Sequence, residues 1–407
     1  MNSGQARDAA IAAPAAAAHA SGALAGLQVL DFTIVMSGPM CTRMLADAGA
    51  DVVKIEPPEG DMSRQRAPLR GGISTYFGSL NCGKRSVVLD LGQEEGRRIA
   101  RALALQCDVL VENFRPGVMQ RLGLDYGTLA ELNPRLVYAS ISGFGQSGPR
   151  AAAPAYAPVI HAASGYELAN AGYQRDAERP LNNGIFLADV LGASYAFGAI
   201  QLALYERERS SRGQHVDVAL LDSVLGMLVY EMLAAQFPPH ARRQLYEPVR
   251  AADGWVMVAA VTPKNQEALF DVIGHPEAKG DPRFATLAAK ESNWGELLQL
   301  IEGWTAQRSG AECERLLMAA GVPCSRYRSV AEAMADPQLA ARGFLAELGT
   351  GAGRFKCANQ PFRLSRTPTQ ARPLLPALGE HGAEVLQEKL ALDAVQIEHL
   401  RAAGVLG

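Results

Sequence analysis

The residue with the clearest capacity for chemistry is Asp189, the one carboxylate in the run LNNGIFLADVLGASYAFGAIQLALY. Small residues follow it at positions 192, 193, 196, 198 and 199, and they let another backbone or a bulky ligand approach closely. A carboxylate in the first turn of such a helix would feel the helix dipole and stay ionised and nucleophilic. Composition alone favours a plain helix cap. The local sequence therefore leaves both roles open.

The segments before Asp189 alternate short apolar runs with helical patterns. Strands are predicted at 27–32, 51–56, 86–91, 108–112 and 136–141, with helices at 37–48 and 93–106. This alternation predicts a doubly wound α/β domain with a parallel sheet, in which ligands bind at the carboxyl ends of the strands. The turn FTIVMSGP lacks the glycines of the dinucleotide fingerprint, so it does not indicate a nicotinamide-binding domain.

The later part of the chain predicts a second region. Residues 143–185 are rich in Gly, Ala, Pro and Asn, and we expect a long functional loop there. The Asp189 helix is predicted to end near residue 209. A shift to Pro, His, Arg and Tyr around residues 238–250 is typical of a linker. A strand at 254–261 then begins a smaller α+β region.

Composition excludes several classes of protein. The 407 residues are 48% hydrophobic and 20% charged, with a net charge of −3, which is typical of a globular protein with two domains and does not favour nucleic acid or membrane surfaces as partners. No charge-free apolar run reaches the length of about 18 residues that a membrane span needs. The six cysteines and seven histidines show no metal-binding spacing. We therefore predict no metal and a cytoplasmic protein with reduced thiols.

Long motifs in this chain resemble the family III CoA-transferases. They include LDFTIVMSGPMCTRMLADAGADVVKIEPPEGDMSR, LNCGKRSVVLDL, DVLVENFRPGVMQRLGLDY and SRGQHVDVALLDS, and they extend in the same order over roughly residues 24 to 380. The family includes formyl-CoA:oxalate and carnitine CoA-transferases, and α-methylacyl-CoA racemase is a relative. Motifs of this length are specific, and they favour a nucleophile over a cap at Asp189, which matches the aspartate of the transferases.

The resemblance implies a fold and an assembly. It implies a Rossmann-like large domain built from both chain ends, an inserted small domain, and an interlocked homodimer. The expected organisation is a disordered tail at 1–25, a large domain at 26–225, a linker at 226–250, a small domain at 251–342 and a return to the large domain at 343–407. The alanine-rich tail carries one arginine and no compact apolar core, so it does not predict a targeting segment.

The resemblance also implies a mechanism without ATP, metal or permanently bound cofactor. Asp189 would attack an acyl-CoA thioester to give a mixed anhydride, and the CoA thiolate would return to make an aspartyl-CoA thioester. An incoming acid would then collect the CoA through a second anhydride. Family motifs assign the binding of coenzyme A to Met36, Ser37, Leu89, Asp90, Leu91, Gly92, Asn113, Phe114, Arg115, Arg121 and Tyr156.

The chain departs from the family pattern at several positions. Pro57 and Gly92 stand where basic residues often hold CoA, and Ala157 replaces an auxiliary carboxylate. His161 replaces a glutamine; it would bind the acceptor carboxylate or act as a base, or it is a hydrogen-bonded loop residue. Arg242 and Arg243 are candidates for the distal end of a dicarboxylic acid, with surface arginines as the commoner alternative. The glycine-rich loop of the oxalate enzyme has no counterpart, which argues against oxalate specificity.

Three functions remain open at this stage. The leading one is a CoA-transferase that moves CoA from a donor such as succinyl-CoA to an organic, including a dicarboxylic, acid. An acyl-CoA racemase needs a His–Asp pair, and this chain has Tyr156 where that histidine would stand. The third is a CoA-binding protein without turnover, since two expected basic contacts are missing.

Overall fold

The computed structural model describes residues 22–174, 179–182, 184–238 and 247–407, and these form two compact units. One unit is Met1–Val229 with Ala341–Gly407, and the other is Tyr230–Ala340. The candidates Arg242 and Arg243 lie outside the described residues. The first described residues already belong to the fold, because the Leu24 amide donates to the Ala48 carbonyl at 2.9 Å.

A six-stranded parallel sheet forms the centre of the first unit. Its strands are β1 (Gln28–Asp31), β2 (Asp51–Glu56), β5 (Arg85–Val88), β6 (Val109–Glu112), β7 (Val137–Ser142) and β8 (His215–Ala219). Their spatial order is β5-β2-β1-β6-β7-β8, and every neighbouring pair is parallel. Counted along the chain this order is 3-2-1-4-5-6, which is the Rossmann order with a switch point between β1 and β6. The predicted fold class is confirmed.

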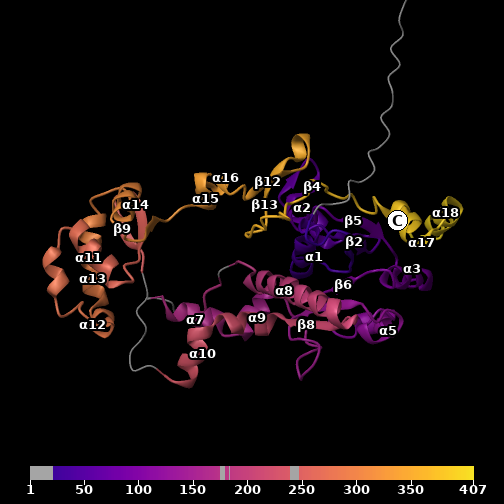
Figure 1. The fold of residues 1–407 in the computed structure, drawn as a ribbon, viewed down its shortest axis with the longest axis horizontal. Coiled ribbons are helices and arrows are strands. Elements are labelled where there is room, and N and C mark those ends of the chain that lie inside the picture. Colours follow the sequence, from indigo (N-terminus) through magenta and orange to yellow (C-terminus); the bar gives the residue numbers. More distant parts are fainter. Residues whose placement is uncertain (1–21, 175–178, 183, 239–246) are drawn as a thin grey trace, which may run out of the picture. The chain divides into compact units, whose positions relative to one another are not determined.

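Helices cover both faces of this sheet (Figure 1). Successive side chains of β1 point to opposite faces of the sheet, so Val29 belongs to the apolar cluster on one face and Leu30 to the cluster on the other. The first face carries α1 (Ser37–Asp47), α6 (Ala157–Ala163), α8 (Leu187–Ser210) and α9 (Leu220–Met227). The second face carries α3 (Glu94–Ala104), α5 (Tyr126–Leu132), α17 (Gly382–Leu390) and α18 (Ala394–Ala402). Both chain ends therefore build one domain.

Helix α8 carries Asp189 and is held tightly in this core. Ala193, Ala196 and Ile200 are fully buried in the first cluster. A Cβ at Gly192 would lie 2.2 Å from Leu220 Cδ2, so only glycine permits this approach of α9. By length and composition, α8 is the one helix among the described residues that would fit across a membrane. Here it packs on the sheet instead.

The predicted loop at 143–185 is wrong over much of its length. The structure has α6 and α7 (Tyr166–Gly172) within it. Helix α6 begins after Tyr156 with a proline in its first turn, and Gly165 before α7 adopts a φ of 80°. Alanine-rich stretches form helices readily, but without a clear polar–apolar period the sequence did not reveal them.

The second unit is an α+β domain with its own core. Its antiparallel sheet has the order β11-β10-β9, formed by β9 (Val249–Ala251), β10 (Gly254–Val258) and β11 (Cys324–Arg326). Its helices are α10 (Val229–Gln236), α11 (Pro263–Val272), α12 (Leu287–Ser292), α13 (Trp294–Thr305), α14 (Gly310–Ala319), α15 (Val330–Met334) and α16 (Pro337–Ala341). Buried residues such as Phe270, Leu317 and Val322 form the core.

Short elements complete the first unit. They are α2 (Thr75–Asn81), α4 (Val118–Leu122), a 3₁₀ turn η1 (Met62–Gln65), and the strand pairs β3 (Leu69–Arg70) with β4 (Ile73–Ser74) and β12 (Leu345–Leu348) with β13 (Phe355–Ala358).

Candidate active site

A cavity of about 580 Å³ opens at the switch point of the sheet. Its walls include residues 34–37 after β1, 113–116 after β6 and 141–143 at the end of β7. Asp189 of α8 also lines it. Ligands of doubly wound sheets bind where the chain leaves neighbouring strands in opposite directions. The cavity lies where the strand order predicts a ligand.

Asp189 lies in the first turn of α8 and is half-buried in the cavity wall. Burial raises the pKa of Asp189 to about 6, and a hydrogen bond with Ser37 lowers it in part. No described cation pairs with this carboxylate. A carboxylate with little hydration and no ion pair is more basic, and therefore more nucleophilic, than a surface aspartate. At neutral pH most of it is still ionised.

The loop between β1 and α1 places Ser37 against Asp189. Val35 in this loop has a φ of 68°, a left-handed conformation that is strained for a β-branched residue. Asn113 fixes the loop, since its Oδ1 accepts from the Ile34 amide at 2.8 Å and its Nδ2 donates to the Ile34 carbonyl at 2.9 Å. Asn113 Nδ2 also lies 3.4 Å from Ser37 Oγ. The β6 loop thus clamps the β1 loop at the cavity.

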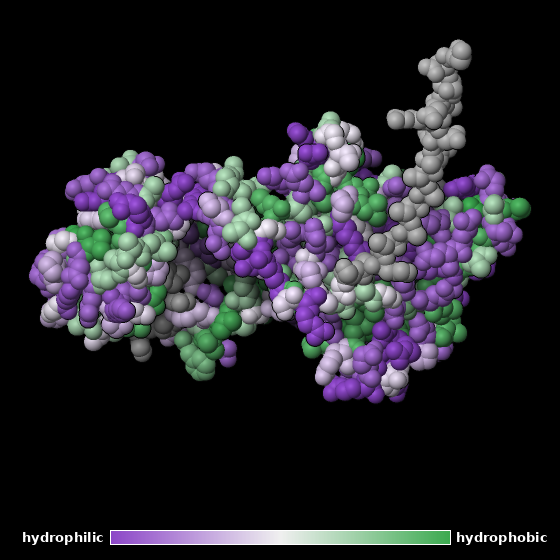
Figure 2. All heavy atoms as spheres, turned by 45° about the horizontal axis from the view of Figure 1, so that its top comes forward, coloured by the Kyte–Doolittle hydropathy of each residue, from purple (hydrophilic) through white to green (hydrophobic). Residues whose placement is uncertain are grey.

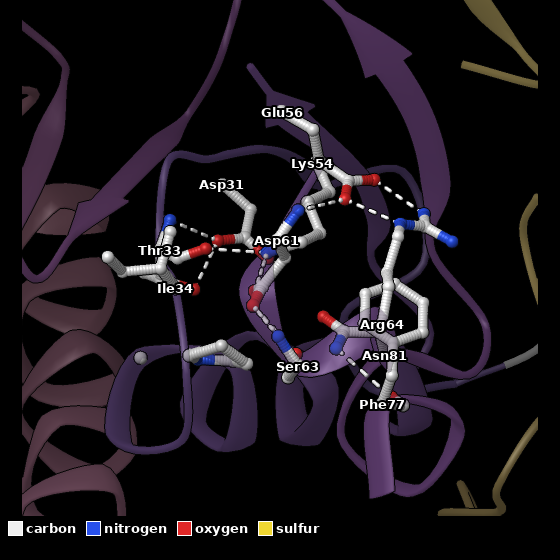
Figure 3. Close-up of polar contacts among 12 residues, drawn as sticks. Asp31, Thr33, Ile34, Lys54, Glu56, Asp61, Ser63, Arg64, Phe77 and Asn81 are labelled. Carbon is white, nitrogen blue, oxygen red and sulfur yellow. Dashed lines mark hydrogen bonds and ion pairs between the residues drawn. The ribbon is translucent and has the colours of Figure 1, made fainter. Parts of the chain in front are cut away.

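A buried network of charges supports the same loop from below (Figure 3). Lys54 donates to the Thr33 carbonyl, and its Nζ lies 3.2 Å from Asp61 Oδ2. Asp31 accepts from the Thr33 amide at 2.8 Å and from Lys84 Nζ at 2.9 Å. Both lysines are fully buried. Paired charges are costly to separate in the interior, so the network holds the strained loop in one conformation.

The pKa of Asp31 in this network is shifted in the opposite direction to the pKa of Asp189. Burial alone would raise the pKa of Asp31, but Lys84 and Lys54 bring the pKa below its ordinary value. Burial lowers the pKa of Lys84 to about 8, although Asp31 opposes this. Asp31 is therefore held as a structural anion.

His161 lies behind the cavity wall rather than in it. It is buried in α6, and its Nε2 accepts from the Ala188 amide at 3.1 Å. This bond requires an unprotonated Nε2, and burial lowers the pKa of His161. The histidine thus satisfies one of the free amides at the N-terminus of α8, one residue before Asp189.

Most of the chain matches one known family. The model of the CoA-transferase family III covers residues 24–382. The chain belongs to CoA-transferase family III. Since the family model and the named relatives are CoA-transferases, this protein is a CoA-transferase, an enzyme that acts on acyl-CoA and carboxylate substrates.

Named relatives are similar over nearly their full lengths. An acetyl-CoA:oxalate CoA-transferase from Acetobacter aceti is 37% identical, and the match covers 93% of this chain and 98% of the relative. A succinate–glutarate CoA-transferase from Agrobacterium fabrum is 35% identical, with coverage of 90% and 95%. A CaiB/BaiF family protein from Brucella suis has a TM-score of 0.78 at 33% identity, covering 91% of this chain and 100% of that chain. Rv3272 from Mycobacterium tuberculosis has a TM-score of 0.81 at 31% identity, with coverage of 90% and 99%.

The structure brings together seven of the residues that the family resemblance had singled out. They line one cavity and are Met36, Ser37, Asn113, Phe114, Arg115, Tyr156 and Asp189. They come from four separate segments of sequence, so only the fold unites them. Tyr156 is 66% exposed, which leaves most of its ring free for a ligand.

Other predicted residues lie outside this cavity. Leu89 is buried and bridges to Leu406, and the Asp90 carboxylate accepts from the Gly92 amide at 2.9 Å in the turn before α3. Leu91 packs partly against the second core cluster. Arg121 is exposed on α4. His161 supports α8, as described above. The roles of these residues in binding CoA or acid stay predictions.

Sequence reasoning missed many residues of the cavity wall, among them Arg66, Tyr76 and Phe186. The Arg66 guanidinium carbon lies 4.6 Å from the centre of the Tyr76 ring and 5.5 Å from that of Phe186. The only local signal is the basic ending of GDMSRQR. That signal does not tell Arg66 from Arg64, which pairs with Glu56 at 2.6 Å.

The arginines of the cavity wall are the natural partners for anionic ligands. Arg66 and Arg115 are both exposed, and neither has a carboxylate partner in the described part of the chain. Arg115 also borders a smaller polar cavity of about 180 Å³. No cluster of three potential metal-ligating side chains occurs among the residues the structure describes.

Proposed function

We propose that this CoA-transferase moves coenzyme A from an acyl-CoA donor, such as succinyl-CoA, to an organic acid, with Asp189 as the nucleophile. The Asp189 carboxylate attacks the donor thioester carbonyl, and the CoA thiolate leaves. The thiolate then attacks the aspartyl carbonyl of the mixed anhydride, which releases the donor acid and leaves an aspartyl-CoA thioester. Each step exchanges one activated acyl bond for another.

The second half of the cycle runs the same steps in reverse. The carboxylate of the acceptor attacks the aspartyl carbonyl and displaces the CoA thiolate, giving a second mixed anhydride. The thiolate attacks the acceptor carbonyl, and the Asp189 carboxylate leaves. No redox change or net hydrolysis occurs, so the bond energy of the donor thioester is retained in the product.

One observation carries this proposal: Asp189 is a half-buried carboxylate that forms no ion pair with any described residue, has a pKa of about 6 and faces a cavity at the switch point. We propose that the Ser37 hydroxyl, which hydrogen-bonds the Asp189 carboxylate, also donates to the tetrahedral oxyanions. Apolar side chains such as Met36, Phe114 and Phe186 line much of the cavity, and with substrate bound they would limit the access of water that hydrolyses the anhydrides.

Coenzyme A fits the side of the cavity formed by the 34–37 and 113–116 loops. We propose that Met36 and Phe114 contact the pantetheine arm and that Arg115 binds a phosphate. The exposed ring of Tyr156 covers the thioester end. Arg115 is suited to this role because a guanidinium binds phosphate oxygens in a bidentate way.

Dicarboxylic acids are the proposed acceptors. The relatives named above act on oxalate, succinate and glutarate by their names. The missing glycine-rich loop argued against oxalate, but the oxalate enzyme of Acetobacter aceti is 37% identical to this chain. Oxalate therefore belongs in the acceptor series beside succinate and glutarate.

We also propose an interlocked homodimer located in the cytoplasm. Large apolar side chains are left exposed on two helices: Tyr195, Leu202 and Tyr205 of α8, and Val229 and Leu233 of α10. Figure 2 shows apolar side chains gathered in the region of α10. A partner chain would cover such surfaces. All six cysteines are free, which suits a reducing compartment.

An exchange screen tests the proposed function. Acyl-CoA donors are mixed with a series of mono- and dicarboxylic acids, and new acyl-CoA species are detected by mass spectrometry. Hydroxylamine should convert the aspartyl-CoA thioester to a hydroxamate on Asp189 in the wild type. An active enzyme whose Asp189→Ala variant keeps full transfer would refute the mechanism. Solvent deuterium at the α carbon without any acceptor would support the racemase instead.

A further inference from the structure

Arg66 places a positive charge without a partner on the cavity wall. It follows η1, its side chain is exposed, and it lines the same cavity as Asp189. No side-chain hydrogen bond or ion pair from Arg66 to any described residue occurs. The rings of Tyr76 and Phe186 hold the guanidinium at 4.6 and 5.5 Å from their centres. Ring contacts occupy the flat face of a guanidinium and leave its N–H edge free to bind a ligand.

The neighbouring Arg64 shows what a structural arginine looks like in this segment. Its Nε and Nη2 donate to both carboxylate oxygens of Glu56 at 2.7 and 2.6 Å. Its guanidinium carbon also lies 3.9 Å from the centre of the Phe77 ring. Every strong interaction of Arg64 is thus made within the protein. Arg66 keeps the ring contacts and lacks the carboxylate.

Tyr76 adds a second unsatisfied polar group at the same place. Its hydroxyl is buried and has no hydrogen-bond partner among the described residues. Burial raises the pKa of Tyr76, Arg66 lowers it and Asp189 raises it, so the hydroxyl lies within the field of both charges. A buried hydroxyl without a partner is costly, and a ligand oxygen would remove that cost.

We propose that Arg66 and Tyr76 form the subsite for the second, non-reacting carboxylate of a dicarboxylic acceptor. This inference rests on the proposed function, because it needs the reacting carboxylate to lie at Asp189. The guanidinium fork binds the distal carboxylate in a bidentate way, and the Tyr76 hydroxyl donates to the same group. A monocarboxylic acid of equal length leaves both groups unsatisfied.

This subsite makes the choice between dicarboxylic and monocarboxylic acceptors depend mainly on Arg66. A dicarboxylate spans from Asp189 to Arg66 and is oriented for attack on the aspartyl thioester. A monocarboxylate reaches Asp189 but gains no such orientation. Discrimination follows because the wrong ligand leaves the buried Tyr76 hydroxyl and the N–H edge of Arg66 without a hydrogen-bond partner.

The test compares Arg66→Gln with Arg70→Gln. Arg70 lies four residues further along in β3, is exposed and does not line the cavity, so it is a matched control for charge. Acetyl-CoA serves as the donor so that the donor itself needs no distal contact. The kcat/KM values are measured for succinate and glutarate and for butyrate and valerate. Arg66→Gln should lower the dicarboxylate-to-monocarboxylate ratio by about 10- to 100-fold. Arg70→Gln should change it by less than about twofold.

Two further variants guard against loss of folding. Arg66→Lys keeps the charge but not the fork, and it should recover only part of the ratio. Tyr76→Phe keeps the ring that holds Arg66 and should lower the ratio by about three- to tenfold. An unchanged ratio in Arg66→Gln, or an equal fall in Arg70→Gln, would overturn the subsite while leaving the transferase intact. A wild type that transfers CoA to no acid would instead overturn the proposed function.

Discussion

Two aspartates of the first unit, Asp31 and Asp189, lie in opposite electrostatic environments. Asp31 at the end of β1 is fully buried, and it accepts from Lys84 at 2.9 Å and from Thr42 at 2.7 Å. Its pKa is held below the ordinary value despite burial. Burial raises the pKa of Asp189 to about 6, because Ser37 is the one described polar partner that opposes this effect. Pairing, rather than depth of burial, decides which carboxylate is inert.

The charged network and the cavity therefore have different roles: the network supports the 34–37 loop, and the cavity holds the reactive carboxylate. The lysines beneath the 34–37 loop neutralise Asp31 and hold the strained Val35 turn in place. The loop presents Ser37 to the cavity but brings no cation to it. Asp189 therefore stays without an ion pair among the described residues, next to a loop that buried ion pairs hold in place.

The largest effect is expected from Asp189→Asn. An amide of the same shape cannot form the anhydride, so CoA transfer should fall by about 10⁴-fold or more. The folded pKa is raised from 3.8 to about 6, so the ionised carboxylate destabilises the fold. Stability is lost as the pH rises between these two values, and the full loss is present above about pH 6. The variant should therefore unfold at a higher temperature at pH 7.5, with a gain of about 1–3 kcal/mol. Transfer assays and calorimetry measure the two effects; a variant that is inactive but less stable would contradict the unpaired state of Asp189.

Lys84→Met tests the network. It leaves Asp31 buried without its ion pair, and the free energy of unfolding should fall by about 3–5 kcal/mol. Chemical denaturation measures this loss. Lys356→Met, on the exposed face of β13, is the control and should change stability by less than about 0.5 kcal/mol. Equal losses in both variants would show that Asp31 does not depend on Lys84.

Ser37→Ala tests how far the Ser37 hydrogen bond lowers the pKa of Asp189. In the wild type the rate of acyl transfer to Asp189 should fall as the pH drops through about 6, because the protonated carboxyl is not a nucleophile. Loss of the Ser37 hydrogen bond should move this midpoint upward by about 0.5–1 pH unit. Single-turnover rates from pH 4.5 to 8 measure the shift. The control Ser194→Ala, whose hydroxyl donates to the Val190 carbonyl further along α8, should keep the wild-type midpoint.

The smallest effect is expected at His161, which acts on Asp189 through the helix backbone. In His161→Leu the Ala188 amide loses its acceptor, and kcat should fall by about three- to tenfold with KM within about twofold. His161→Gln, whose carbonyl can accept the same bond, should restore most of kcat. A histidine that bound the acceptor acid would instead raise KM in both variants.

Local sequence patterns predict much of this fold. The six parallel strands carry apolar runs between turn residues, and α8 with its first-turn Asp189 stands out by composition. General rules of βαβ connection favour a doubly wound parallel sheet, but the strand order itself comes from the structure. Family motifs added the residues of the 34–37 and 113–116 loops, which no local pattern distinguishes from ordinary turns.

Other parts of the site depend on distant contacts that no local pattern records. Lys54 and Lys84 are fully buried, whereas lysine in a sequence normally indicates the surface. Arg66 meets Phe186 only because η1 and the start of α8 converge on one cavity, 120 positions apart in sequence. The free Arg66 and the paired Arg64 look alike until Glu56 is located in space.

Transfer of an oxygen atom from acceptor to protein is the most direct test of Asp189 as the acyl carrier. An acceptor acid labelled with ¹⁸O in its carboxylates is turned over many times with acetyl-CoA, and the protein is digested for mass spectrometry. The bridging oxygen of the second anhydride stays on the aspartate when the thiolate departs with the acyl group. The peptide that contains Asp189 should therefore gain ¹⁸O, and no other peptide should. Continued CoA transfer without label at Asp189 would contradict an aspartyl intermediate.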